Sequence, residues 1–207
     1  NLTMALGYNR PDDIPITLST VMQNIIDDKT LDVSQGIIHH SEGVDLLPSN
    51  IEMSGFEVRL INAMSRERVL KTYVNEVKKN YDYVLIDCMP SLGMITINAL
   101  AAADSVIIPT QPHYLSAKGL ELLLRSVSMV KRQINPKLRI DGILMTMVMP
   151  RTNISKEITA TVKSAYGKKI KVFDTEIPHS IRAVEATAEG KSIFAYDKSG
   201  KVAAAYE

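Results

Sequence analysis

Hydrophobic positions along the chain follow two patterns, short apolar runs and longer stretches with a helical period. The short runs predict strands at residues 36–40, 44–48, 83–87, 105–109, 142–147 and 170–173. The periodic stretches predict helices at residues 14–28, 57–79, 92–102, 116–134, 154–166 and 180–188. Expected N-caps are Ser116 for the fourth helix and Asn153 or Ser155 for the fifth.

Strands and helices alternate along most of the chain, and this order is typical of right-handed βαβ units. The first two strands are the exception, since Ser41-Glu42-Gly43 between them predicts a hairpin turn. We therefore predict an α/β fold with a mostly parallel sheet and helices on both faces. In such folds ligands bind where the carboxyl ends of the strands meet. Asp87 stands at the end of one predicted strand.

Composition limits the possible classes of protein. The 207 residues suffice for one α/β domain, and no repeat or linker divides them. The single cysteine, Cys88, excludes an internal disulfide and is interpreted as a small core residue. No apolar run reaches the roughly 18 residues of a membrane helix, so no membrane association is expected. Net charge is +1, but residues 151–207 carry 10 Lys and Arg against 7 Asp and Glu, which weakly favours an anionic partner.

The sequence around Asp87 carries the most chemical information. Asp87 ends an apolar run, and Pro90, Ser91 and Gly93 form a turn into the next predicted helix. In nucleotide hydrolases an Asp at such a position holds Mg²⁺, usually through water. The alternative is structural: Asp87 caps the turn and Ser91 caps the helix. No glycine-rich phosphate loop precedes Asp87 in this sequence.

Several segments, in matching order, resemble the ParA/Soj family of chromosome- and plasmid-partitioning ATPases, the deviant Walker A branch of P-loop proteins. They are residues 1–3, 44–55, 62–71, 81–100, 103–120, 142–153 and 175–207. One departure is Met89, where the family usually has the first of two prolines. The family's Walker A loop, its lysines and its switch I Asp are not among these residues. The chain is therefore expected to be a single ParA-like P-loop NTPase domain of the SIMIBI and AAA_31/CbiA type, spanning 1–207 and incomplete at both ends.

The resemblance assigns roles to the residues already singled out. It implies that Asp87 is the Walker B carboxylate, which binds Mg²⁺ indirectly through water. It implies that Pro90, Ser91 and Gly93 form switch II, which senses the γ-phosphate of ATP and rearranges on hydrolysis.

Two further pairs of residues would hold the adenine base of ATP by the same resemblance. These are Arg151 and Asn153 on one segment and Ile177 and Pro178 on another. The amide of Asn153 can offer one donor and one acceptor to a base edge, although the residue can also be a simple helix cap.

The function implied by the resemblance is an ATP-dependent DNA-partitioning ATPase. ATP and Mg²⁺ would join two subunits into a homodimer that binds DNA non-specifically, with Arg182 and Lys191 as candidate contacts. A ParB-like centromere-binding protein would stimulate hydrolysis, in a bacterial-type cytoplasm on the nucleoid. Without a phosphate loop this stretch alone is expected to be inactive. Two alternatives stay open: a MinD-like membrane-cycling regulator, which needs an amphipathic basic C-terminal helix, and a nucleotide-free interaction or regulatory module.

Overall fold

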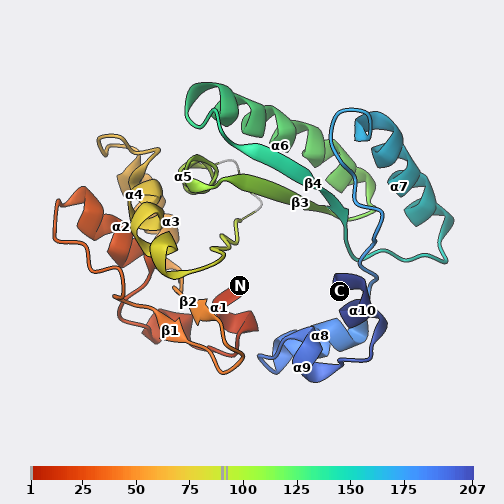
Figure 1. Cartoon of the computed structure of the whole chain (residues 1–207), viewed down its shortest axis with the longest axis horizontal. Helices are drawn as coiled ribbons and strands as arrows, with labels where there is room; N and C mark the ends of the chain where they lie inside the picture. Colours follow the sequence, from red (N-terminus) through yellow and green to blue (C-terminus); the bar gives the residue numbers. More distant parts are fainter. Residues whose placement is uncertain (1, 90, 92) are drawn as a thin grey trace. The chain divides into compact units, whose positions relative to one another are not determined.

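The structure, a computed structural model, describes residues 2–89, 91 and 93–207 (Figure 1). Pro90, predicted to belong to a switch, lies outside the described residues. The chain forms two compact units. The first unit comprises residues 1–103 and 130–136, and the second unit comprises residues 104–129 and 137–207.

The first unit is mostly helical. Its elements are α1 (Leu2–Ala5), η1 (Pro11–Asp13), α2 (Leu18–Ile26), β1 (Ile38–His39), β2 (Asp45–Leu46), α3 (Glu52–Leu60), α4 (Val69–Val77), η2 (Lys78–Asn80) and α5 (Met94–Ala102). The strands β1 and β2 pair antiparallel, which confirms the predicted hairpin around residues 41–43.

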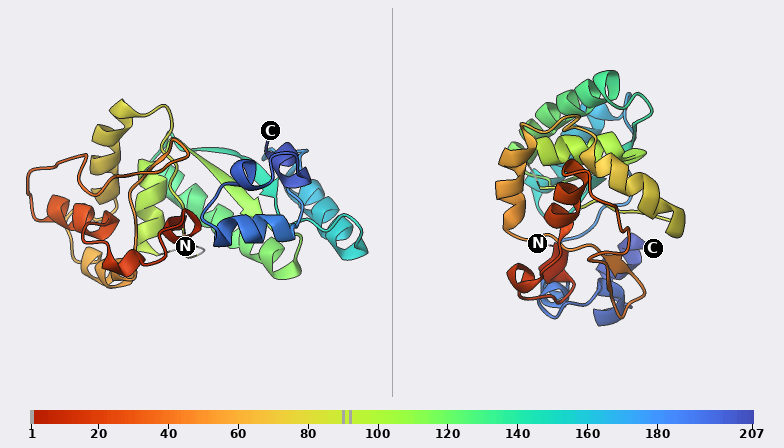
Figure 2. Two further views of the ribbon diagram at one scale, coloured as in Figure 1. Left: turned by 90° about the horizontal axis from the view of Figure 1, so that it is seen from below. Right: turned by 90° about the vertical axis from the view of Figure 1, so that its left-hand side faces the viewer.

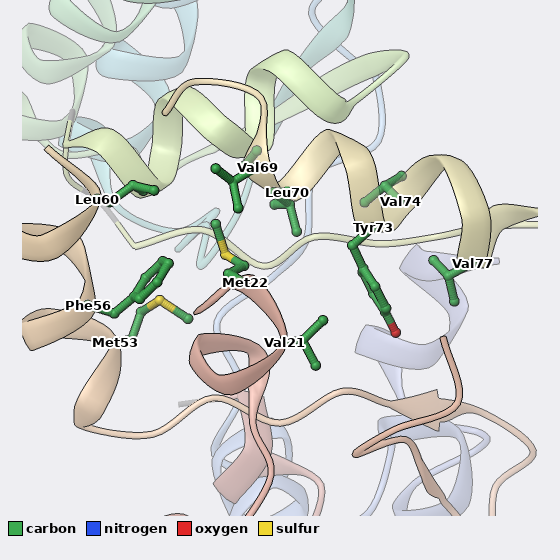
Figure 3. Packing of buried hydrophobic residues seen from close by; sticks show 11 residues of the cluster. Val21, Met22, Met53, Phe56, Leu60, Val69, Leu70, Tyr73, Val74 and Val77 are labelled. Carbon is green, nitrogen blue, oxygen red and sulfur yellow. The ribbon is translucent and has the colours of Figure 1, made fainter. Parts of the chain in front are cut away.

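Helices α2, α3 and α4 build the core of the first unit. Each presents an apolar face, and Figure 3 shows these side chains directed toward one another. The core residues of the three helices are Val21, Met22, Met53, Phe56, Leu60, Val69, Leu70, Tyr73, Val74 and Val77. Full burial of one such side chain stabilises the fold by about 1.5–3 kcal/mol. Each of the three helices therefore contributes one apolar face to the same core.

A buried amide joins α5 to the start of α4. Asn98 is fully buried, and its Oδ1 accepts a hydrogen bond from the backbone N–H of Leu70 at 3.1 Å. Its Nδ2 donates to the carbonyl oxygens of Arg66 at 2.7 Å and Met94 at 3.0 Å. One side chain thus bonds to the Leu70 N–H and the Arg66 carbonyl, which do not pair with each other because α4 begins between them, and also to a carbonyl in the first turn of α5.

A second asparagine closes the other end of α5. Asn135, also buried, donates from Nδ2 to the carbonyl oxygens of Leu100 at 3.0 Å and Ala103 at 2.8 Å. These carbonyls lie at the C-terminal end of the helix, where no intrahelical partner remains. Both ends of α5 are therefore fixed by asparagine amides.

The prediction of one continuous helix over residues 57–79 is wrong. The structure has α3 and α4 instead, separated by residues 61–68. Ser65 adopts a left-handed backbone conformation with φ of 51°, which interrupts a right-handed helix. The apolar period also lapses over this polar stretch, so a continuous helix would have no face to bury there.

The buried strand predicted at residues 83–87 does not form. Tyr83 is 86% exposed and Leu85 is 89% exposed, and no strand among the described residues pairs with this segment. A strand needs a neighbour for its N–H and C=O groups, and without one an apolar run has no sheet to join. Cys88, predicted to lie in the core, is consequently exposed as well.

The second unit carries the parallel part of the fold. Its elements are β3 (Ser105–Thr110), α6 (Tyr114–Gln133, whose last residues belong to the first unit), β4 (Arg139–Met145), α7 (Asn153–Tyr166), α8 (Ile181–Ala188), α9 (Ile193–Tyr196) and α10 (Lys201–Tyr206). The strands β3 and β4 are parallel, as predicted. The strand predicted at 170–173 is reduced to a parallel bridge between Val172 and Ile143. The helices α8, α9 and α10, blue in Figures 1 and 2, contact one another in sequence order.

One face of the β3–β4 pair is covered by α6 and α7. Ile108 and Ile143 lie opposite each other in the register and pack with Leu120 of α6 and Val162 of α7. On strand β4 the next inward residue, Met145, is fully buried in the same cluster. Alternation along the strands therefore supplies a one-sided apolar surface to two helices.

Residues 171–173 approach β4 closely at Gly142. A Cβ atom on Gly142 would lie 2.7 Å from the ring of Phe173 and 2.9 Å from the carbonyl oxygen of Lys171. The N–H of Phe173 donates to the carbonyl oxygen of Ile143 at 3.0 Å. Only glycine leaves room for this pairing.

Two predicted helix caps are wrong. Helix α6 begins at Tyr114, so Ser116 lies inside its first turn. The N-cap of α7 is Thr152, neither Asn153 nor Ser155. Ser155 is buried instead and accepts a hydrogen bond from the N–H of Met149 at 3.3 Å.

A polar triad ties the hairpin to the segment before Asp87. Asp45 accepts a hydrogen bond from the Tyr81 hydroxyl at 2.6 Å and is 2.6 Å from Nδ1 of His39. These two partners lower the pKa of Asp45, with the Tyr81 bond as the larger cause. The same bond, with a smaller contribution from burial, raises the pKa of Tyr81 to about 12.

Replacing Asn98 tests the junction between α4 and α5. Asn98→Ala leaves the Leu70 N–H and the Arg66 carbonyl without this partner, so unfolding should become easier by about 2–4 kcal/mol. Urea denaturation followed by circular dichroism measures the change. Asn75→Ala is the matched control on exposed α4 surface, with an expected change within about 0.5 kcal/mol. Equal effects of the two substitutions would contradict the junction.

The triad gives a titration signature. The Tyr81–Asp45 bond should be intact below the ordinary tyrosine pKa of about 10 and lost as pH rises through 12. On the acid side it should be lost as pH falls below the Asp range, because the pKa of Asp45 is lowered. A spectrophotometric tyrosine titration should show a late phase that Tyr81→Phe and Asp45→Asn both reduce, while the part due to Tyr73, whose pKa is raised by burial, remains. Tyr83→Phe, at an exposed position in the same segment, should retain the late phase.

Candidate nucleotide site

The predicted Mg²⁺ residue is an exposed carboxylate. Asp87 lies near the end of segment 82–89, which forms neither helix nor strand, and it makes no hydrogen bond to Ser91 or to any other described residue. The structural alternative, in which Asp87 caps the following turn, therefore has no support among these residues. A free carboxylate is a suitable oxygen ligand for Mg²⁺ or for its water shell.

The predicted switch leads into α5. The N–H of Ser91 donates to the carbonyl oxygen of Met89 at 2.7 Å, and the Ser91 carbonyl accepts from Oγ1 of Thr96 at 2.8 Å. Gly93 is the N-cap residue of α5, so Ser91 is not the cap. Ser91 is therefore tied to α5 through Thr96.

The two segments predicted to flank adenine are neighbours in the second unit. Val148, just beyond β4, forms a parallel bridge with Pro178. Its N–H donates to the carbonyl oxygen of Ile177 at 3.0 Å, and its carbonyl accepts from the N–H of His179 at 3.0 Å. The N–H of Ile177 donates to the carbonyl oxygen of Met145 at 2.9 Å. These bonds continue the β4 edge beyond the strand itself.

Arg151 and Asn153 follow this paired segment by three and five residues. Both are exposed, and Asn153 is the first residue of α7. Ile177 is buried, whereas Pro178 is half-buried. An apolar wall and an exposed amide at one strand edge provide the two kinds of contact that an adenine base takes.

The remaining predicted residues carry charge in the helices of the second unit. Arg182 forms an ion pair with Glu185 at 3.6 Å, and its guanidinium lies 6.0 Å from the centre of the Tyr196 ring. A hydrogen bond with Tyr196 and then the charge of Glu185 raise the pKa of Arg182. Lys191 pairs with Glu189 at 2.8 Å. Both candidate DNA contacts thus have acidic neighbours.

The described residues contain no cluster of three or more His, Cys, Asp or Glu that could hold a metal ion. Mg²⁺ differs from zinc in this respect, because it usually keeps several waters and takes one or two protein carboxylates beside phosphate oxygens. Asp87 alone therefore fits a Mg²⁺ site that the nucleotide would complete. No helix in the described part of the chain has the length and hydropathy needed to span a membrane.

One polar contact near the switch was not predicted. Glu57 of α3 accepts a hydrogen bond from the N–H of Ile95 in the first turn of α5 at 3.3 Å. Glu57 stands at the start of a predicted helix, and nothing in that pattern indicates a contact across 38 residues. Only the packing of α3 against α5 brings it there.

The comparisons with known proteins agree with the fold. The family model AAA_31, described as an AAA domain, matches residues 1–140. The chain is 39% identical over 207 residues to the sporulation initiation inhibitor protein Soj of Bacillus subtilis (strain 168), covering 100% of this chain and 79% of Soj. It is 36% identical over 189 residues to the chromosome partitioning protein ParA of Myxococcus xanthus (strain DK1622), covering 90% of this chain and 65% of ParA.

Among solved structures, cobyrinic acid a,c-diamide synthase from Mycobacterium smegmatis with bound ATP analog and magnesium is similar to this chain. The TM-score is 0.78 at 32% identity, over 97% of this chain and 80% of that one. These relatives share the α/β fold of P-loop NTPases, in which helices accompany a parallel sheet. The chain belongs to the ParA/Soj family of P-loop partitioning ATPases.

Proposed function

We propose that this chain acts in an ATP-dependent partitioning ATPase that dimerises on ATP and binds DNA non-specifically. A ParB-like centromere-binding protein would stimulate its hydrolysis, in the cytoplasm on the nucleoid. The observation that carries the proposal is the unpartnered Asp87 carboxylate beside the Ser91–Gly93 loop, in a chain 39% identical to Soj over its whole length.

Asp87 would hold Mg²⁺ through a water molecule, and the ion would supply charge stabilisation at the phosphates of ATP. The carboxylate is exposed and has no described partner, so it can orient a water without first breaking a protein contact. The backbone around Ser91 and Gly93 would then follow the state of the nucleotide.

The base would lie against the paired segments of the second unit. Ile177 would supply the apolar wall, with Pro178 beside it, and the amide of Asn153 would bond to the base edge. Arg151 would offer its exposed guanidinium to the same ligand. The support for this arrangement is the backbone pairing that joins the two segments at Val148.

The DNA surface would include Arg182 and Lys191, and phosphate contacts would make binding indifferent to base sequence. A single subunit with net charge +1 should bind weakly. Joining two subunits doubles the surface, so ATP should strengthen DNA binding.

The Mg²⁺ role of Asp87 is tested in the full-length protein. Asp87→Ala should lower the rate of ATP hydrolysis about 100-fold or more, because metal-assisted charge stabilisation contributes several kcal/mol. Melting temperature should stay unchanged, since the side chain is exposed and has no described partner. Phosphate release at several Mg²⁺ concentrations is the measurement. Asp82→Ala, an exposed carboxylate on the same segment, should keep wild-type turnover; wild-type turnover in Asp87→Ala would sink the assignment.

The DNA role of Arg182 is tested by fluorescence anisotropy at several salt concentrations, with and without ATP. Arg182→Ala should weaken binding to all duplexes equally and flatten the log–log salt slope by about one unit. Glu185→Gln should act in the opposite direction, because it removes the acidic partner of Arg182.

The control for Arg182 is Arg125→Ala on α6. Arg125 pairs with Glu121 at 2.6 Å one helical turn away, so this change removes the same charge and the same kind of ion pair. Its DNA affinity should be close to wild type. Equal losses in the two arginine variants would mean that only net charge matters, and the local surface would be disproved.

A further inference from the structure

The start of α5 is held by a carboxylate from another helix. Glu57, half-buried on α3, directs Oε1 at the N–H of Ile95, one of the N–H groups in the first turn of α5. Such groups have no intrahelical acceptor and carry the positive end of the helix dipole. The contact is therefore favourable both as a hydrogen bond and as a charge interaction.

Gly93 makes room for this carboxylate. A Cβ atom at this position would overlap Oε1 of Glu57 and lie 3.0 Å from its Cδ. The backbone of Gly93 has φ of −74°, a conformation open to every residue. The space, and not the backbone conformation, is thus what a larger residue at 93 would violate.

Other bonds fix the same turn from its remaining sides. Asn98 donates to the carbonyl of Met94, and Thr96 donates to the carbonyl of Ser91. These two come from within α5 itself. Glu57 is the contact that joins this turn to α3, and α3 is part of the buried core through Met53 and Phe56.

The geometry points to Glu57 as a positioning residue for the loop of residues 91–93, acting through the first turn of α5. This inference rests on the proposed function, in which the loop responds to the γ-phosphate. The carboxylate keeps the helix start fixed, so that Gly93 and Ser91 are held at a defined place relative to α3. Without Glu57 the first turn loosens, and the loop loses its defined starting point. Glu57 itself touches no nucleotide in this assignment.

Amide hydrogen exchange tests the contact without any need for catalysis. In the full-length protein, Glu57→Ala should reduce protection of the Ile95 amide about ten-fold or more, as expected for loss of a hydrogen bond to a charged group. Glu57→Gln keeps an acceptor but removes the charge, so its loss should be about two- to five-fold. Glu52→Gln, an exposed carboxylate in the first turn of α3, is the matched control and should leave Ile95 unchanged.

A double-mutant cycle links Glu57 to Gly93. Gly93→Ala should expel the carboxylate and reduce Ile95 protection as Glu57→Ala does. The double variant should then be no worse than either single one, because both remove the same contact. Additive losses would show that Glu57 and Gly93 act independently, and that result would overturn the inference.

Hydrolysis kinetics separate this inference from the proposed function. Glu57→Ala should lower kcat about ten-fold or more and leave KM for ATP near the wild-type value, since positioning is lost and nucleotide contacts are not. An unchanged kcat with lost Ile95 protection would reduce Glu57 to a structural contact and refute the positioning role. A wild-type protein that hydrolyses no ATP would refute the proposed function instead. The positioning role would then fall with it, whatever the protection of Ile95, because there would be no reaction to position.

Discussion

The first unit depends on one buried side chain, the amide of Asn98. Two helices begin beside it, and every helix start leaves N–H groups that water cannot reach in a core. Asn98 accepts a hydrogen bond from the N–H of Leu70 and donates to the carbonyls of Arg66 and Met94. The break between α3 and α4 is tolerable because this amide replaces the lost helical bonds. The position of α5 follows from that arrangement together with the contacts of Asn135 and Glu57 at its two ends.

The sequence predicted the elements whose causes are local. Helix α2 and the hairpin β1–β2 follow from apolar spacing and turn residues, and the parallel pair β3–β4 follows from two apolar runs joined by a long helix. The prediction of a strand at residues 83–87 failed because a strand also needs a neighbouring strand for its hydrogen bonds. That neighbour is not encoded in the local sequence. The prediction of one continuous helix over 57–79 failed at Ser65, whose left-handed φ of 51° interrupts the helix where the apolar period lapses.

In the candidate site, too, the sequence indicates residues with local signals and misses contacts between distant residues. Asp87 could be singled out because an acidic residue after an apolar run is visible in the sequence alone, and its Mg²⁺ role stays a prediction for an exposed carboxylate with no hydrogen bond to another described residue. The ion pair of Arg182 with Glu185 was within reach, because residues three apart share a helix face. Glu57 was beyond reach, because its partner Ile95 is distant in sequence and its significance depends on the missing side chain of Gly93.

The exposed segment 82–89 has a consequence for how this protein behaves in solution. It presents Tyr83 and Leu85 to water together with backbone groups that pair with no described strand. Such a segment is a template on which another chain can add a strand. A net charge of +1 provides little long-range repulsion to keep two molecules apart. Self-association through this segment is therefore expected to increase with protein concentration.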